Sequence, residues 1–271
     1  MTKKDILNMN YVDFIAFLRE ENRCPGGKDS IRRIVQNSFI DEKSKVLEIG
    51  SNNGFSSLEV AHISRAKLFG IDISRSCVKE SNRRLSEETK DVRSRVQFQI
   101  GSAYKIPFPD NYFDLVMAGG ATTFMTDKNK AIDEYYRVVK QWSIVSVVQL
   151  YYRIEPPKLL LKKVSDIIGI KIKSYGEEDW LNIFDNNKFE KYYFEKHELE
   201  KKTKSQITRY VDSFFKKPHL EHYDDRLKAV IRDKWYNYIK IFNENNKYLG
   251  YFILLLRKRP YPEEMELFTK K

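Results

Sequence analysis

Two glycines and two carboxylates lie at the ends of two successive apolar runs. One carboxylate and both glycines lie where the first run ends and a helix begins, and the second carboxylate lies at the end of the next run. Residues 46–61 read VLEIGSNNGFSSLEVA, with Glu48 at the end of the run and with Gly50 and Gly54 in the turn. A glycine turn lets the backbone approach a polar ligand, and the free N–H groups of the following helix add donors. Asp72 ends the next run, 18 residues after Gly54, where a carboxylate can accept hydrogen bonds from a ribose diol. We therefore predict a nucleotide-type cofactor site.

The glycine spacing decides between two cofactor classes. A dinucleotide site needs G-x-G-x-x-G, and the turn GSNNGFSS lacks that spacing, which disfavours a nicotinamide oxidoreductase. The turn instead reads E-x-G-x-N-x-G, with Asn52 in the place of a middle glycine. Asn tolerates left-handed backbone angles better than most residues other than glycine, so we expect a modified but working site.

Three ordered stretches between about residues 45 and 149 resemble the class I S-adenosylmethionine-dependent methyltransferases. The first is the glycine turn, which is similar to the family's E/D-x-G-x-G-x-G. The second, GSAYKIPFPDNYFDLVMAG, is similar to G-D-A-x-x-L-P-F-P-D-x-x-F-D-L-V, and the third, AIDEYYRVVKQWSIVSVVQ, to E-x-x-R-V-L-K-P-G-G. The resemblance is greatest to the small-molecule subgroup with the ubiquinone and menaquinone biosynthesis methyltransferases. The departures are Asn52, Ser102 in place of an aspartate, and Gln141-Trp142 in place of the proline-glycine pair.

The resemblance implies S-adenosylmethionine as cofactor, with S-adenosylhomocysteine as its product, and a role for each matched residue. Glu48 would face the amino group of the methionine moiety, Asp72 would accept the ribose hydroxyls, and Ile73 would pack on the adenine. The remaining cofactor residues would be Gly50, Ser51 and Asn52 beside the cofactor, Gly54 for helix packing, Ser102 and Ala103 at the adenine edge, and Ala118 and Gly119 under the sulfonium. A packing glycine at Gly54 and a helix cap at Asp72 are the ordinary alternatives.

Catalytic and substrate residues are expected outside the cofactor motifs. Methyl transfer from a sulfonium depends on in-line positioning, and a general base is needed only when the nucleophile must lose a proton. The best candidates for that base, His219, His222 and Tyr223, share the segment KPHLEHYDD and have a surface role as the alternative. The candidate substrate residues are Tyr11, Thr122, Thr123, Tyr151 and Tyr152, although the two threonines could instead cap the next helix. Neither Cys24 nor Cys77 has metal-ligand spacing, so we expect no metal.

The elements that position these residues follow from the alternation of apolar runs and helical segments. Buried strands are predicted by KVLEIG, KLFGIDI, VQFQIG, FDLVMAG and SIVSVVQLYY, and helices are expected at 55–64, 74–88 and 128–140. Later in the chain, EPPKLLLKKVSDII and EEDWLNIFDNN predict helices, and KFEKYYFEKHEL and KYLGYFILLLRKR predict two further strands. Such alternation builds right-handed βαβ units, so we predict an α/β fold with a Rossmann-like, seven-stranded, mostly parallel sheet covered by helices on both faces.

Four segments follow from the same pattern. We expect an N-terminal helical cap at 1–40, with one helix over residues 3–20 and another over 28–39, and a cofactor-binding core at 41–200. A basic helical insertion or lid would occupy 201–246, with helices at 203–215 and 224–243. The last segment, 247–271, would hold a strand that closes the sheet and a C-terminal tail.

Composition limits the classes of protein that remain. With 41% hydrophobic residues, the 271-residue chain can bury a sizeable core. No apolar run approaches the ~20 residues that span a bilayer, and two cysteines are too few for a disulfide scaffold, so a cytoplasmic setting fits best. The formal charge is +11, and residues 200–259 hold 15 Lys/Arg against 7 Asp/Glu. Such a surface attracts nucleic acid, anionic lipid or an acidic substrate, or is simply a solvated face.

These observations favour methyl transfer to an O, N or C nucleophile of a small metabolite or short peptide. An RNA methyltransferase that uses the basic insertion is the first alternative, although the sequence has no N-P-P-Y or D-P-P-Y motif. A non-catalytic binding subunit with the methyltransferase fold is the second alternative, because Asn52 and Ser102 depart from the family pattern. The sequence leaves the oligomeric state open.

Overall fold

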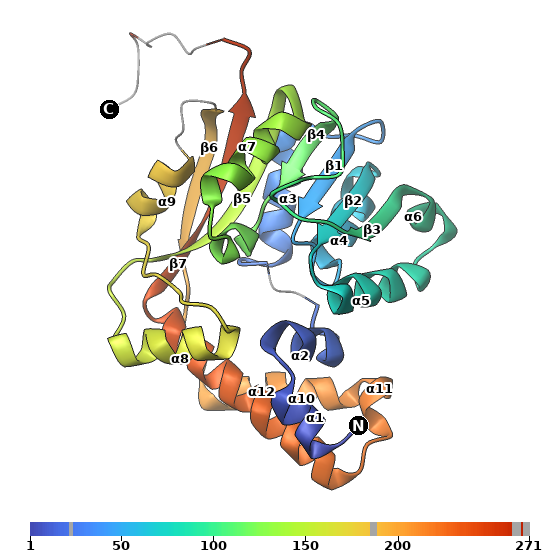
Figure 1. Cartoon of the computed structure of the whole chain (residues 1–271), viewed down its shortest axis with the longest axis vertical. Coiled ribbons are helices and arrows are strands. Elements are labelled where there is room, and N and C mark those ends of the chain that lie inside the picture. The colour runs from blue at the N-terminus through green and yellow to red at the C-terminus, as the bar shows by residue number, and fades with distance from the viewer. Residues whose placement is uncertain (22–23, 185–188, 262–266, 268–271) are drawn as a thin grey trace.

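The protein is described by a computed structural model that covers residues 1–21, 24–184, 189–261 and 267. Its centre is a seven-stranded sheet in the order β3-β2-β1-β4-β5-β7-β6 (Figure 1). The strands β1 to β5 run parallel, and β7 is antiparallel to both of its neighbours. The bounds are β1 Lys45–Ile49, β2 Lys67–Asp72, β3 Val96–Ile100, β4 Phe113–Met117, β5 Val139–Tyr152, β6 Phe189–Glu198 and β7 Leu249–Lys258. The predicted fold class is therefore confirmed.

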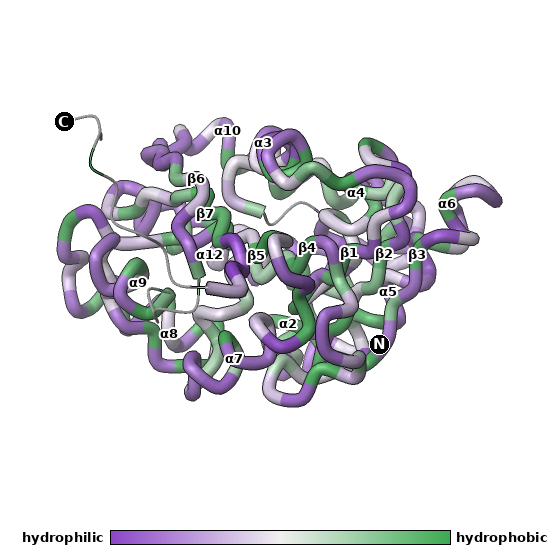
Figure 2. Tube along the Cα trace, turned by 90° about the horizontal axis from the view of Figure 1, so that it is seen from above, coloured by the Kyte–Doolittle hydropathy of each residue, from purple (hydrophilic) through white to green (hydrophobic). Residues whose placement is uncertain are grey.

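Helices cover both faces of the sheet, which explains why the central strands read as continuous apolar runs. One face packs against α3 (Lys28–Ser38), α4 (Phe55–Ser64), α5 (Arg75–Ser86) and α6 (Lys90–Arg95). The other face packs against α7 (Lys128–Val138) and α9 (Glu177–Phe184). Figure 2 shows that hydrophilic stretches prevail at the periphery of the molecule.

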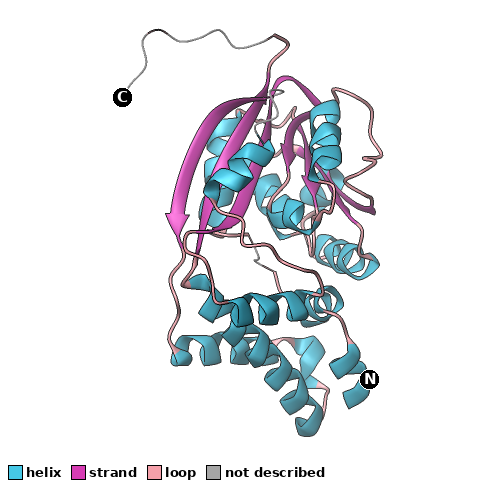
Figure 3. Ribbon diagram, turned by 60° about the vertical axis from the view of Figure 1, so that its left-hand side comes forward, coloured by secondary structure: helices cyan, strands magenta, loops and turns pink. Residues whose placement is uncertain are grey.

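A separate helical layer lies below the sheet, at the end toward which the parallel strands run (Figures 1 and 3). Its helices are α1 (Lys3–Asn8), α2 (Tyr11–Leu18), α8 (Lys158–Ile168), α10 (Lys204–Ser213), the 3-10 helix η2 (Phe214–Lys216), α11 (Pro218–Glu221) and α12 (Asp225–Asn246). Phe14 and Leu18 of α2 share one buried cluster with Val211 of α10 and Trp235 of α12. The N-terminal helices and the helices of residues 201–246 thus pack together. Within the described residues, no helix combines the length and apolarity that crossing a membrane requires.

The structure corrects three expectations about the elements. Residues 3–20 form two helices, because the side chain of Asn10 accepts the N–H of Asp13 and begins a new helix. The last strand does not close the sheet, since β7 lies between β5 and β6 and leaves β6 at the edge. The helix expected at 128–140 ends at Val138 because β5 begins at Val139. The end of the expected helical run EEDWLNIFDNN and most of the C-terminal tail lie outside the described residues.

Candidate functional site

The turn between β1 and α4 has an unusual backbone. Gly50, Asn52 and Gly54 all adopt left-handed conformations, with φ of 69°, 47° and 77°. A Cβ on Gly54 would lie 2.7 Å from the ring of Phe98, so this glycine is required for packing beneath the turn. Asn52 occupies the region of backbone space that Asn tolerates, and the turn therefore forms without the middle glycine.

Asp72 ties this turn to the end of β2. Its Oδ2 accepts the backbone N–H of Asn52 at 2.9 Å, and its Oδ1 accepts the N–H of Ser74 at 2.8 Å. Burial raises the pKa of Asp72, while the bonds from these backbone N–H groups act to lower it. A carboxylate oxygen has two lone pairs, so each oxygen can accept a further hydrogen bond from a ligand hydroxyl.

Glu48 is buried and faces the start of α4. Its Oε2 accepts the backbone N–H of Ser57 at 3.0 Å and the Ser57 hydroxyl at 2.5 Å. Burial raises the pKa of Glu48 to about 7, and the hydrogen bonds from Ser57 oppose that rise. The N-cap of α4 is Gly54, which has no side chain, so Glu48 supplies the acceptor that orders this helix end.

The same edge of the sheet presents groups without protein neighbours. Ile73, directly after β2, is 76% exposed, and a Cβ on Gly119 or Gly120 would meet no atom within 4 Å. The Ser51 hydroxyl is buried and has no hydrogen-bond partner among the described residues. The Ser51 hydroxyl is too buried for a ligand to reach. Ile73 and the open glycine segment are accessible to a ligand, and their contacts with S-adenosylmethionine stay predictions.

The other expected cofactor residues contribute mainly backbone at this edge. The Ser102 hydroxyl accepts the N–H of Tyr104 at 3.2 Å. Ala103 and Ala118 are buried in the sheet core, and Ala118 donates its N–H to the carbonyl of Ser146. The adenine-side role of Ser102 stays a prediction.

Thr122 and Thr123 lie in the 3-10 helix η1 (Gly120–Phe124), which follows β4. The Thr122 hydroxyl donates to the carbonyl of Ala118 at 3.3 Å, and Thr123 Oγ1 accepts from Nε2 of Gln149 at 2.7 Å. The side chain that caps α7 is that of Asp127, so the alternative that the threonines cap this helix is wrong. Sequence reasoning missed Gln149, although a polar residue inside the apolar run SIVSVVQLYY was a visible signal.

The three tyrosines expected at the substrate are engaged in packing. The ring of Tyr11 lies edge-on against Phe242, with 5.6 Å between the ring centroids. Tyr151 packs beside Phe252, and the Tyr152 hydroxyl bonds the side chain of Asn245. Their contact with substrate stays a prediction.

The candidate bases His219, His222 and Tyr223 lie on and just after α11, beyond α2 as seen from the sheet in Figure 1. Nε2 of His219 is 3.0 Å from the carbonyl oxygen of Phe17, and burial lowers the pKa of His219 to about 4. The ring centroids of His222 and Tyr223 are 4.2 Å apart. These contacts support a packing role in the helical layer, and the geometry does not favour the predicted catalytic role.

Contacts that the sequence did not reveal hold α2 against α5, the helix that follows Asp72. The Ser76 hydroxyl donates to Oδ1 of Asp13 at 2.6 Å. Further along, Arg19 pairs with Glu80 at 3.7 Å. The N-terminal helices are therefore fixed beside the cofactor edge.

The fold and this site define a Rossmann-like protein that takes S-adenosylmethionine as its cofactor. Comparison with known proteins agrees, because residues 47–147 match the family model described as "Methyltransferase domain". Residues 47–147 are thus recognised as a methyltransferase domain, which supports the resemblance to the class I S-adenosylmethionine-dependent methyltransferases.

Two curated relatives show how far the likeness in sequence extends. The chain is 27% identical over 47% of its length to a ubiquinone/menaquinone biosynthesis C-methyltransferase of Shewanella frigidimarina, and the match covers 50% of that relative. It is 30% identical over 42% of its length to the phosphoethanolamine N-methyltransferase of Plasmodium falciparum, and that match covers 42% of the relative. The matched segments thus span about half the length of these relatives.

Solved structures show the same fold at low identity. Haemonchus contortus phosphoethanolamine N-methyltransferase 2, in complex with phosphomonomethylethanolamine and S-adenosylhomocysteine, superposes with a TM-score of 0.71 at 16% identity and covers 96% of this chain and 60% of its own. The [4+2]-cyclase SpnF superposes with a TM-score of 0.66 at 21% identity and covers 91% and 93% of the two chains. Because one neighbour is a cyclase, the fold alone does not specify the reaction.

Proposed function

We propose that the protein transfers a methyl group from S-adenosylmethionine to an O, N or C nucleophile of a small metabolite or short peptide. The observation that carries this proposal is the pair of hydrogen bonds from the N–H groups of Asn52 and Ser74 to Asp72. These bonds hold the turn after β1 and the start of α5 in one arrangement before any ligand binds. Preorganisation of this kind reduces the ordering that binding requires.

The chain's own residues would act mainly by binding and positioning. Asp72 would accept the ribose hydroxyls, Ile73 would cover the adenine, and the backbone of Gly119 would pass beneath the reacting centre. Glu48 would keep α4 ordered and contribute to the site of the methionine amino group. The bound cofactor supplies an already activated methyl group, so positioning accounts for much of the catalysis.

The RNA alternative loses support from the contacts of the basic segment. The Nζ of Lys234 donates to three backbone carbonyls. The Nζ of Lys258 donates to two backbone carbonyls and to the amide oxygen of Asn111. Arg232 pairs with Asp212, and Arg257 binds Glu190 through two nitrogens. These four of the 15 basic residues in 200–259 are therefore engaged in contacts within the protein, which reduces the charge free for RNA and favours a small acceptor. A cytoplasmic setting stays a prediction from the cysteine count.

Calorimetric titration with S-adenosylmethionine and S-adenosylhomocysteine, with NAD as the control ligand, tests the cofactor site. We expect micromolar binding of the first two, equivalent to about −8 kcal/mol, and none of NAD. Asp72→Ala should weaken both by roughly tenfold or more, since a hydrogen bond to a charged group contributes about 1.5–3 kcal/mol. Asp91→Ala, at an exposed carboxylate of α6, is the matched control.

Turnover is tested by S-adenosylhomocysteine release in the presence of metabolite and peptide pools. Cofactor binding with no release from any pool, RNA included, would favour the non-catalytic binding subunit. Release with RNA alone would favour the RNA methyltransferase. Absence of cofactor binding up to millimolar concentrations would contradict the proposal itself.

A further inference from the structure

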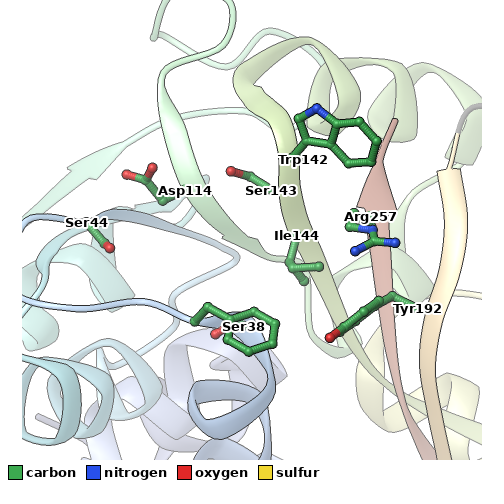
Figure 4. A pocket seen from close by; sticks show the side chains of 9 residues that line it. Ser38, Ser44, Asp114, Trp142, Ser143, Ile144, Tyr192 and Arg257 are labelled. Atoms are coloured by element: carbon green, nitrogen blue, oxygen red, sulfur yellow. The ribbon is translucent and has the colours of Figure 1, made fainter. Parts of the chain in front are cut away.

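A pocket of about 190 Å³ lies at the opposite end of the sheet from Asp72 and Gly119 (Figure 4). Ser44, which lines it, precedes β1, and Asp114 is the second residue of β4, so the pocket belongs to the amino-terminal ends of these strands. The cofactor residues all follow the carboxyl ends of the strands. The proposed methyl transfer therefore does not use this pocket.

Aromatic side chains form its walls. Phe39, Trp142 and Tyr192 line the pocket, with Phe39 76% and Trp142 48% exposed. The ring centroids of Phe39 and Tyr192 are 6.2 Å apart. The guanidinium carbon of Arg257 lies 4.7 Å from the ring centroid of Tyr192 and 5.6 Å from that of Trp142. Arg257 thus covers part of Tyr192, and the exposed rings of Phe39 and Trp142 are the surfaces on which a planar group can stack.

Two of these aromatic residues are held in backbone conformations that favour glycine. Phe39 has φ of 55° and Trp142 has φ of 65°. Trp142 also stands on a bulge, because β4 advances from Phe113 to Leu115 while β5 advances from Val139 to Ile144. It occupies the position at which the resembling family carries glycine. Phe39 is the C-cap of α3, where a left-handed residue commonly ends a helix. Trp142 is at no helix end, and strain of about 1–3 kcal/mol at such a residue persists mainly at functional sites.

Polar groups surround these flat surfaces, but the charges are already paired. Asp114 accepts from Nζ of Lys140 at 2.6 Å, and Arg257 binds both oxygens of Glu190 at 2.6 and 2.7 Å. The other oxygen of Asp114 accepts the backbone N–H of Lys45 at 2.8 Å. Among the serines of the pocket, Ser44 both accepts from and donates to Asp41, and Ser38 donates to the carbonyl of Val35. Ser143 lines the pocket as well. Paired charges favour an uncharged ligand, and the volume is too small for more than one ring system because drug-sized pockets begin near ~300 Å³.

We propose that this pocket binds a single nucleobase, stacked on Phe39 and Trp142 and bonded along its edge by Ser143 and by the remaining lone pairs of Asp114. Bases stack on aromatic and guanidinium planes and carry donors and acceptors along their edges, which these surroundings match. An aromatic amino-acid side chain would stack equally well but carries fewer edge groups to bond Asp114 and Ser143. The ribose and phosphate of the ligand would extend from the pocket into solvent.

Tryptophan fluorescence tests the proposal directly. The chain has three tryptophans, of which Trp180 and Trp235 are 2% and 0% exposed, so the half-exposed Trp142 should report on ligand in the pocket. AMP, GMP, CMP and UMP are titrated against the full chain in saturating S-adenosylhomocysteine, which occupies the cofactor site. We expect saturable quenching by at least one of them. No saturable change with any mononucleotide or with a short single-stranded oligonucleotide would overturn the proposal.

Variants separate binding from folding. Trp142→Gly and Phe39→Asn suit the observed left-handed backbone, so both should fold and bind S-adenosylhomocysteine as the unmodified chain does. Calorimetry should show nucleotide binding weakened roughly tenfold or more, as expected for loss of one base–aromatic stack. Arg65→Gly, at another left-handed position (φ of 60°) on the end of α4, is the matched control and should leave nucleotide binding unchanged. Nucleotide binding that survives both pocket variants would also overturn the proposal.

The source of the base is settled by the same titrations. Binding of mononucleotides at least as tight as that of the oligonucleotide identifies a free nucleotide as the ligand. Binding of the oligonucleotide alone identifies the base as part of RNA, and its affinity should then fall steeply with salt. Either result supports a nucleobase pocket.

Discussion

The backbone N–H of Asn52 donates a 2.9 Å hydrogen bond to Oδ2 of Asp72 and so joins the turn after β1 to the end of β2. The residue that departs from the family's glycine pattern is thereby bound to the carboxylate expected at the ribose. The Asn52 side chain makes a further contact, with 3.6 Å between its Oδ1 and Sγ of Cys77 at the start of α5. The side chain of Asn52 thus adds one contact that a glycine would lack.

Substitution of Asn52 should show whether this turn needs only a left-handed backbone. Asn52→Gly should bind S-adenosylmethionine within about threefold of the unmodified chain, because the hydrogen bond to Asp72 comes from the backbone. Asn52→Val should bind roughly tenfold more weakly, since a β-branched residue at positive φ costs about 1–2 kcal/mol. Calorimetry measures both affinities. Equal affinities for the Gly and Val variants would contradict the requirement for a left-handed residue.

Glu48 should make the stability of the protein depend on pH. Burial raises its pKa from 4.5 to about 7, so between these values the folded state holds a proton that the unfolded state has released. The free energy of unfolding should therefore fall by roughly 3 kcal/mol at most as pH rises from about 4.5 to 7. Above pH 7 it should level off.

Urea unfolding at several pH values between 5 and 8 measures this dependence. Glu48→Gln removes the ionisable group while it retains a side-chain oxygen for Ser57. The variant should not show the loss of unfolding free energy that the titration of Glu48 causes. Its stability relative to the unmodified chain should therefore increase from pH 5 to pH 8. Parallel curves for the two proteins would show that Glu48 does not titrate in this range.

Lys234 should be essential for the attachment of the N-terminal helices. Its buried Nζ lies on α12 and donates to the carbonyls of Ile6, Leu7 and Met9 at 2.7, 3.1 and 2.7 Å. Lys234→Met would leave these carbonyls without their donor, so we expect a loss of about 3 kcal/mol in the free energy of unfolding. Lys240→Met, at an exposed lysine of the same helix, should change it by less than about 0.5 kcal/mol. Similar effects of the two substitutions would rule out this role of Lys234.

The sequence predicted those parts of the fold that depend on local pattern. The run from Lys45 to Ile49 and the helix over Phe55–Ser64 follow from apolar periodicity and a glycine turn, and both are observed. The break between α1 and α2 depends partly on Lys234, more than 220 residues away, which satisfies the carbonyls at the end of α1. The place of β7 inside the sheet likewise depends on pairing with distant strands. Hydrophobic patterns along the chain carry no information on such contacts.

In the candidate site, too, the features set by local spacing were predicted and those set by distant contacts were not. Spacing alone placed Gly50, Gly54 and Asp72 at one edge, because strands of a parallel sheet end together. It did not reveal that Ser57 binds Glu48 or that Gln149 binds Thr123, since these partners come from other elements. The chemical capability of His219 was visible in the sequence, while its contact with Phe17 was not, and the catalytic role stays a prediction.

Gly120 should separate folding from function at the end of β4. A Cβ at this position would meet no atom within 4 Å, so Gly120→Ala and Gly120→Val should leave the protein folded. If the open space belongs to the cofactor and the methyl acceptor, each added group would intrude on them, and the larger one more. We expect affinity for S-adenosylhomocysteine to fall modestly for Ala and by roughly tenfold or more for Val, while the thermal unfolding midpoint changes little. Calorimetry and thermal unfolding on the same samples measure both quantities. Undiminished affinity in Gly120→Val would place the cofactor elsewhere, because a side chain of that size cannot share the space with a ligand packed against the backbone.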